Sequence, residues 1–141
     1  MTIITEYAYT SFNLLFLNQG SKPRRIWEFD NSWGWNTLTF KVYDLQNKTS
    51  AIKIKKLSTK GWTKNGPTFF EVDAGSRYNV PINLLDNDWE IPGEADPLKT
   101  KDVVLKVILD IPPSAEAKEF GVFVGALESN DIILNPPHKW L

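Results

Sequence analysis

The sequence predicts an all-β protein, a single antiparallel β-sandwich spanning residues 1–141 with one short helical turn near residues 114–119. Two observations predict this class. Apolar residues recur at every second position in many short segments, and no segment sustains the spacing of an amphipathic helix. Turn-forming residues separate roughly seven to nine such segments, without the strand–helix alternation of a parallel sheet.

The first half of the chain contains two extended segments and a hairpin. Apolar residues alternate over residues 12–16, before the polar break at residues 18–20. Trp27 and Phe29 alternate with acidic residues, as in a half-buried strand, and a turn is expected directly after them. Residues 37–58 show the same alternation on both sides of a polar turn, which predicts a β-hairpin.

The second half continues the pattern. Its further expected strands are residues 69–72, 78–84, 103–111 and 131–134. Pro81 cannot donate to a β-ladder, so its strand is expected at a sheet edge or at a bulge. The segment 103–111 has the longest alternation and is expected at the centre of a sheet. Ser114 can cap the helical turn, and residues 120–125 are expected to be extended.

Two short segments resemble parts of known sandwich domains. Residues 125–134, with Ser129-Asn130 ahead of the last strand, look like the close of many immunoglobulin-like or fibronectin-like domains. The Asp73-Ala74-Gly75-Ser76 turn is similar to a mid-domain turn in such modules. The resemblance implies an immunoglobulin-like sandwich, although the cysteine and tryptophan spacing of antibody domains is missing. A jelly-roll sandwich fits the alternating pattern as well.

The composition excludes several kinds of chemical site and predicts the cellular compartment. The chain has no cysteine, which excludes disulfides, zinc–thiolate sites and a cysteine nucleophile. The N-terminal residues lack the basic and apolar regions of a signal peptide. The most apolar segment, residues 103–111, is too short to span a bilayer and contains Lys106 and Asp110. These features predict a soluble, cytoplasmic protein.

Charge is distributed unevenly along the chain. Residues 1–66 carry ten Lys and Arg against four Asp and Glu, whereas residues 67–141 carry six against thirteen. This distribution lacks the domain-wide basic excess of a nucleic-acid-binding module, so no nucleic-acid partner is expected. The opposite charges can pair within the fold or between copies, which allows self-association. The alternative is a set of solvent-facing lysines on strands.

No catalytic constellation is present, so we predict a protein that is not an enzyme and needs no cofactor. His138 is the single histidine and stands close to the C-terminus, where chains usually fray. No nucleophile elbow, phosphate-binding glycine loop or histidine-based metal motif occurs. A glycosidase remains the open enzymatic alternative, because that reaction needs only two carboxylates.

The long connection over residues 86–102 is rich in acidic residues, and connections of this length are often functional. Its acidic residues are candidate ligands for Ca²⁺, which prefers several carboxylate and carbonyl oxygens. They are Asp86, Asp88, Glu90, Glu94 and Asp96. Ile91 occupies the position where an EF-hand loop has glycine. Solvated acidic side chains are therefore the favoured interpretation of this loop.

The tryptophan-rich turns are the strongest candidate site. Trp33 and Trp35 flank Gly34, and short polar residues stand just before them. Flat aromatic faces with nearby polar groups suit sugar recognition, and the same combination suits a protein-binding hot spot. The candidate ligand-binding residues are Trp33, Trp35, Asp30, Asn31, Trp62 and Trp89.

These residues favour a non-catalytic module that binds carbohydrate through exposed tryptophan-rich loops. A protein-interaction or assembly domain that uses strand edges and oppositely charged faces is the alternative. The third interpretation places the same rings in the core or uses them to anchor loops, because a sandwich core consumes large aromatic side chains.

Overall fold

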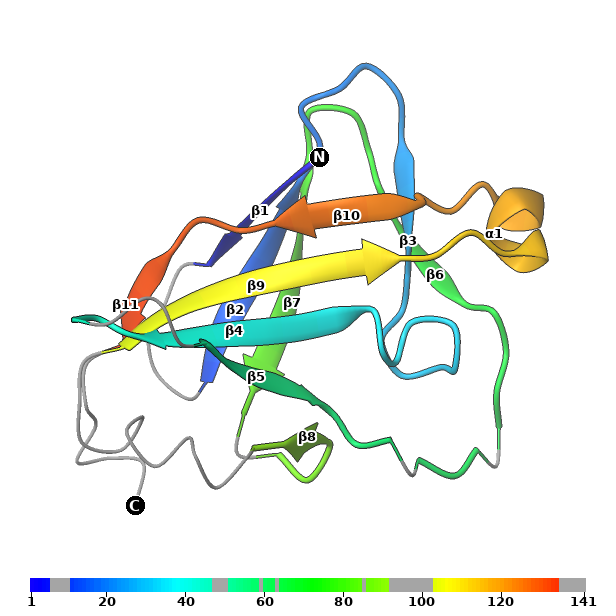
Figure 1. The fold of residues 1–141 in the computed structure, drawn as a ribbon. Helices are drawn as coiled ribbons and strands as arrows, with labels where there is room; N and C mark the ends of the chain where they lie inside the picture. The colour runs from blue at the N-terminus through cyan, green and yellow to red at the C-terminus, as the bar shows by residue number, and fades with distance from the viewer. Residues whose placement is uncertain are drawn as a thin grey trace.

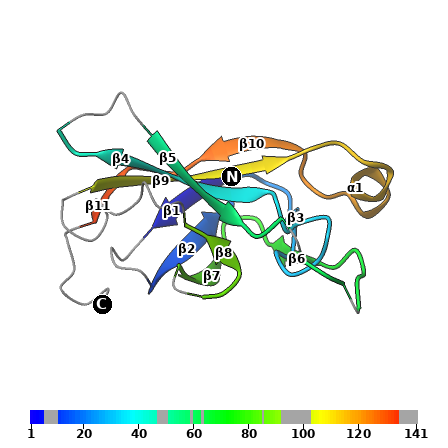
Figure 2. The same cartoon turned by 60° about the horizontal axis from the view of Figure 1, so that its bottom comes forward.

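The computed structural model describes residues 1–5, 11–46, 51–58, 60–62, 64–84, 86–91 and 103–134 (Figure 1). Within these residues 51% of the chain is in β-strands, which pair antiparallel, and 6% is helical, so the prediction of an all-β, sandwich-like fold is confirmed. The described strands belong to two layers that face each other across a common apolar core (Figure 2).

The front layer of Figure 1 is a large sheet with the strand order β10-β9-β4-β5-β8, and β11 also pairs with β9. Its strands are β4 (Leu38–Asp44), β5 (Ala51–Lys56), β8 (Trp89–Glu90), β9 (Val103–Ile111), β10 (Gly125–Glu128) and β11 (Ile132–Leu134). The predicted hairpin is the β4–β5 pair, in register at Phe40 and Ile54. The longest strand, β9, lies between β4 and β10, as its alternation predicts.

The second layer consists of two smaller groups of strands behind the large sheet. One group is β1 (Thr2–Thr5), β2 (Ser11–Leu17) and β7 (Arg77–Asn83), in that order. The other is the pair β3 (Arg24–Trp27) and β6 (Phe69–Val72). In Figure 1, β2 and β7 cross steeply behind β9 and β4. Among the described strands β7 pairs only with β2, so Pro81 lies on an edge strand, as predicted.

Alternating side chains from the two layers form the core. Phe40 and Leu105 of the large sheet and Leu14 and Phe16 of β2 are each fully buried. The ring of Phe12 meets the ring of Phe40 edge-to-face at 5.6 Å between centroids, which joins the layers directly. This packing explains why the apolar positions recur with a period of two.

The short helical turn is confirmed as α1 (Ala115–Phe120), the one helix in the described part of the chain. Ser114 caps it by accepting a hydrogen bond from the backbone N–H of Ala117 at 3.0 Å. The helix ends at Gly121, whose φ of 65° lies in the left-handed region that favours glycine. The prediction of extended chain from residue 120 is therefore wrong at its start, and β10 begins only at Gly125.

The side chain of Asn18 connects two turns at one end of the second layer through hydrogen bonds. Its side chain is 2% exposed, and its Nδ2 donates to the carbonyls of Val72 at 2.9 Å and Lys22 at 2.7 Å. Its Oδ1 accepts from the N–H of Gly20 at 3.0 Å, so the amide is engaged on both sides. A polar residue at a predicted break thus holds the start of β3 against the end of β6.

Replacing Asn18 with leucine is expected to lower the free energy of unfolding by about 2 kcal/mol, because two carbonyls and one N–H lose their buried partner. Urea unfolding followed by tryptophan fluorescence measures the change. The control is Asn36→Leu at an exposed position. Equal losses in the two variants would contradict the role of Asn18.

Candidate functional site

The loop between β3 and β4 carries the predicted tryptophan site. Its turns close through hydrogen bonds from the N–H of Trp35 to the carbonyl of Asn31 at 2.8 Å and from the N–H of Thr37 to that of Gly34 at 3.2 Å. Asn31 is 3% exposed, and its Nδ2 donates to both oxygens of Thr68, while its Oδ1 accepts from the N–H of Gly34. The polar atoms of Asn31 therefore hold the loop in place.

The tryptophans fall into two groups in the structure. Trp35 and Trp89 are only 4% and 9% exposed, and the indole Nε1 of Trp35 donates to the carbonyl of Leu57 at 2.7 Å. Trp62 is half-buried, edge-on to Trp35 at 5.5 Å. Trp33 is half-buried against Trp27 at 6.0 Å, away from this group. The geometry agrees with the interpretation of these rings as core and loop anchors.

Sequence reasoning missed the residue around which these rings gather. Lys56 follows Ile52 and Ile54 on the inward face of β5 and is 7% exposed. Its Nζ lies 4.2 Å from the ring centroid of Trp35 and 5.5 Å from that of Trp89. Such contacts between an ammonium and aromatic faces are favourable cation–π interactions. The parity of Lys56 with the two isoleucines is the signal that could have revealed it.

Lys56 is also held by polar and charged neighbours. Its Nζ donates to the carbonyl of Phe29 at 2.6 Å. Burial lowers the pKa of Lys56 from 10.5 to about 8, although the nearby carboxylates of Asp88 and Asp30 act in the opposite direction. The folded protein thus keeps a destabilised ammonium beneath the loop at neutral pH.

This lowered pKa makes stability depend on pH. Between about pH 8 and pH 10.5 the unfolded chain holds a proton on Lys56 that the folded chain has released, so stability is expected to rise with pH across this window. The rise is at most about 1.4 kcal/mol per pH unit. Urea unfolding at several pH values measures the free energy of unfolding across this window. The contribution of Lys56 to its rise is expected to be absent from Lys56→Met. Parallel pH profiles for the two proteins would contradict the assignment.

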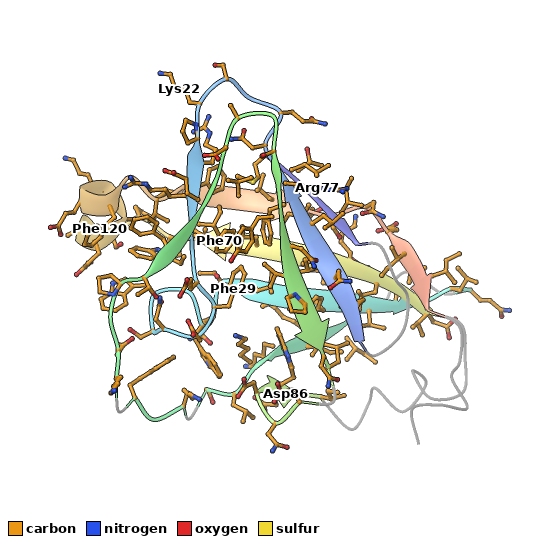
Figure 3. All side chains as sticks on the ribbon, turned by 180° about the vertical axis from the view of Figure 1, so that it is seen from behind. Lys22, Phe29, Phe70, Arg77, Asp86 and Phe120 are labelled. Atoms are coloured by element: carbon orange, nitrogen blue, oxygen red, sulfur yellow. The ribbon has the colours of Figure 1, made fainter. Side chains whose placement is uncertain are left out.

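A cleft opens where β6 and β7 diverge from the turn that connects them. Figure 3 shows Phe70 and Phe29 in the opening between these strands. The cleft has a volume of about 350 Å³. Its lining residues are Glu28, Phe29, Asp30, Lys56, Phe70, Tyr78, Asn79, Val80 and Pro81. We call this feature the β6–β7 cleft.

Tyr78 gives the cleft an accessible aromatic face. It is 40% exposed and stacks on Phe70 with ring centroids 4.3 Å apart and an interplanar angle of 15°. Phe29 in turn lies 6.0 Å from Phe70. Asp30 and Asn79 on the rim are exposed, so the aromatic surface is bordered by polar groups. Of the predicted site residues, Asp30 is the one that lines this cleft.

A second hollow, of about 470 Å³, lies beside the turns at Asn18 and Gly75. It is lined by Leu17, Asn18, Gln19, Gly75, Ser76 and Arg77 and contains no aromatic ring. Because the amide of Asn18 is already engaged with the backbone, this hollow offers less for ligand recognition than the β6–β7 cleft.

The acidic candidates for calcium are only partly described. Asp86 lies beyond the end of β7 in Figure 3, and the N–H of Asp88 points to its Oδ1 at 3.4 Å. Among the described residues no three Asp, Glu or His side chains gather closely enough to hold a metal ion. Glu94, Asp96 and His138 lie outside the described residues.

The described part of the chain contains no helix long and apolar enough to cross a membrane. No protein-family model matches the sequence, and no curated protein sequence matches it either. Inferences about function therefore depend on the geometry of the β6–β7 cleft and of the sheet surfaces.

Proposed function

We propose that this protein is a non-catalytic recognition module that binds carbohydrate in the β6–β7 cleft. The observation that carries the proposal is the exposed Tyr78 ring, stacked on Phe70 and bordered by Asp30 and Asn79. Sugar rings present C–H groups that pack on flat aromatic faces, and their hydroxyls need short polar side chains nearby.

The size and chemistry of the cleft suit a small sugar. Its volume of about 350 Å³ falls at the lower end of the ~300–1,000 Å³ range of ligand pockets. The carboxylates of Glu28 and Asp30 accept hydrogen bonds from hydroxyls, and the amide of Asn79 can donate or accept. The ammonium of Lys56 lies at the same cleft as a further donor.

The proposed ligand is the class that the sequence favours, but the aromatic face that binds it belongs to Tyr78 and not to a tryptophan. Trp35 and Trp89 are engaged with Lys56, whereas Tyr78 offers a ring face from an edge strand. Asp30 keeps its expected role because its exposed carboxylate lines the cleft.

A protein partner is the second candidate, and one observation favours it. Among the described strands β7 pairs only with β2, so its other edge pairs with no described strand, and Asn79, Val80 and Pro81 of β7 line the cleft. An extended peptide can add to such an edge through main-chain hydrogen bonds. Pro81 removes one donor from that edge and would limit the pairing to the residues before it.

A glycan array probed with the purified protein tests the proposal. We expect a hit that is lost in Tyr78→Ala and weakened roughly tenfold or more in Asp30→Asn, since each removes a direct contact. The matched controls are Tyr43→Ala and Asp110→Asn on the opposite face of the large sheet, which are expected to bind normally. A blank array with folded protein would overturn the carbohydrate proposal in favour of a peptide. Binding that survives in Tyr78→Ala would overturn the assignment to the cleft.

A further inference from the structure

Figure 1 looks directly onto the outer face of the large sheet. The strand registers place three lysines side by side on this face. Lys41 of β4 pairs in register with Lys53 of β5 on one side and with Lys106 of β9 on the other. Directly paired residues share a face of the sheet, and adjacent strands lie about 4.8 Å apart. The three ammonium groups therefore form a row across the sheet. Lys55, on the same face of β5, extends it.

This row is unfavourable in an isolated chain, because like charges directly opposite each other destabilise a sheet. Lys106 is compensated within the chain by Asp131 at 3.4 Å and Glu128 at 3.6 Å. Within the described residues, Lys41 and Lys53 form no ion pair. The basic half of this face, centred on β4 and β5, has one acidic neighbour, Glu90 of β8, which pairs in register with Lys55. Lys41 and Lys53 therefore carry the unbalanced positive charge of this half.

The other half of the same face is acidic. Asp110 of β9 pairs with Ala126 of β10, and Glu128 pairs with Ile108, which places both carboxylates on the outer side. Asp110 and Glu128 are exposed, as is Asp131 just beyond β10. Ile133, on the same side of β11, is 50% exposed and adds apolar surface. One continuous face therefore has a basic half and an acidic half.

We propose that this face binds a second copy of the chain in a two-fold symmetric dimer. A two-fold axis places the basic half of each copy over the acidic half of the other, so one surface is complementary to itself. β5 of one copy then lies over β10 of its partner in sheet-on-sheet packing. A second copy supplies both signs of charge, whereas a uniformly acidic partner would meet repulsion from Asp110 and Glu128.

The dimer face and the β6–β7 cleft lie on opposite sides of the sandwich. Lys56 and the core face inward from β5, while Lys53 and Lys55 face outward. Sugar binding and dimerisation can therefore succeed or fail separately. Two copies joined in this way would carry their clefts on the two outer surfaces of the dimer.

Sedimentation equilibrium of the full chain over a range of concentrations tests the proposal. We expect a monomer–dimer equilibrium whose dissociation constant rises about tenfold or more when salt is raised to about 0.5 M, because screening weakens surface charge pairs. A chain that stays monomeric at every concentration in low salt would overturn the proposal. So would a dissociation constant that salt does not change.

Charge-reversed variants identify the face. In the first double variant, Lys41→Glu with Lys53→Glu, the basic half of the face becomes acidic. In the second, Asp110→Lys with Glu128→Lys, the acidic half becomes basic. Each alone is expected to be monomeric, and a one-to-one mixture is expected to form a heterodimer. Lys22→Glu, an exposed site on the turn away from this face, is the matched control and should dimerise like the wild type (Figure 3). Circular dichroism confirms that each variant is folded. Variants that self-associate like the wild type, or a mixture that stays monomeric, would overturn the assignment of the face.

Discussion

Replacing Gly34 with alanine is expected to destabilise the protein by about 3 kcal/mol or more, because the added methyl group collides with backbone rather than with a movable side chain. A Cβ at this position would lie 1.9 Å from the carbonyl oxygen of Glu28 and 2.9 Å from its carbon. Gly34 also accepts hydrogen bonds from the N–H and Oγ1 of Thr37 and donates to Asn31, so the loop has little freedom to move away.

Thermal and urea unfolding of Gly34→Ala measure this loss. The matched control is Gly61→Ala, since a Cβ at Gly61 meets nothing within 4 Å. We expect the control to change stability by less than about 0.5 kcal/mol. If both variants unfold at the same denaturant concentration, the close approach of the loop to residue 28 is wrong.

Replacing Trp35 with alanine is expected to lower the free energy of unfolding by about 3–5 kcal/mol. The change removes a buried indole and the hydrogen bond from its Nε1 to the carbonyl of Leu57. It also removes the aromatic face nearest to the Lys56 ammonium, so a buried charge loses one of its favourable contacts.

Trp35→Phe separates these contributions, because it keeps an aromatic ring near Lys56 and loses only the indole hydrogen bond and some volume. An intermediate loss of stability is expected in urea unfolding. An unchanged melting temperature for Trp35→Ala would instead make Trp35 a free surface ring and restore it as a sugar platform.

Much of the fold can be predicted from local patterns. The alternation in residues 37–58 and 103–111 reports which side chains face a core, and the hairpin and the central strand follow from it. Pro81 restricts its strand to an edge through the same local chemistry. Pairings between distant segments, such as Phe12 with Ile82, depend on the packing of the whole chain and leave no local signature.

The candidate site is less predictable because it depends on what covers each side chain. Tyr78 shares its alternation with Ile82, which is buried, yet Tyr78 is exposed because the ring of Phe70 of β6 packs on one face of it and leaves the rest of the side chain accessible. Trp35 stands in a polar turn, yet it is buried because the end of β5 packs against it. Lys56 lies over its ring, and the carbonyl of Leu57, the next residue, accepts from its Nε1. Alternation indicates the direction of a side chain and cannot indicate whether a neighbouring segment covers it.

The most direct test of the proposed sugar site is an NMR titration of the isotopically labelled protein with the best array ligand. Shifts are expected for the backbone amides of Asp30, Asn79 and Val80, which line the β6–β7 cleft. The amides of the outer sheet face, such as Lys53 and Lys106, are expected to stay unchanged at a fixed protein concentration. Shifts confined to other parts of the chain, with no change along the cleft, would contradict the account.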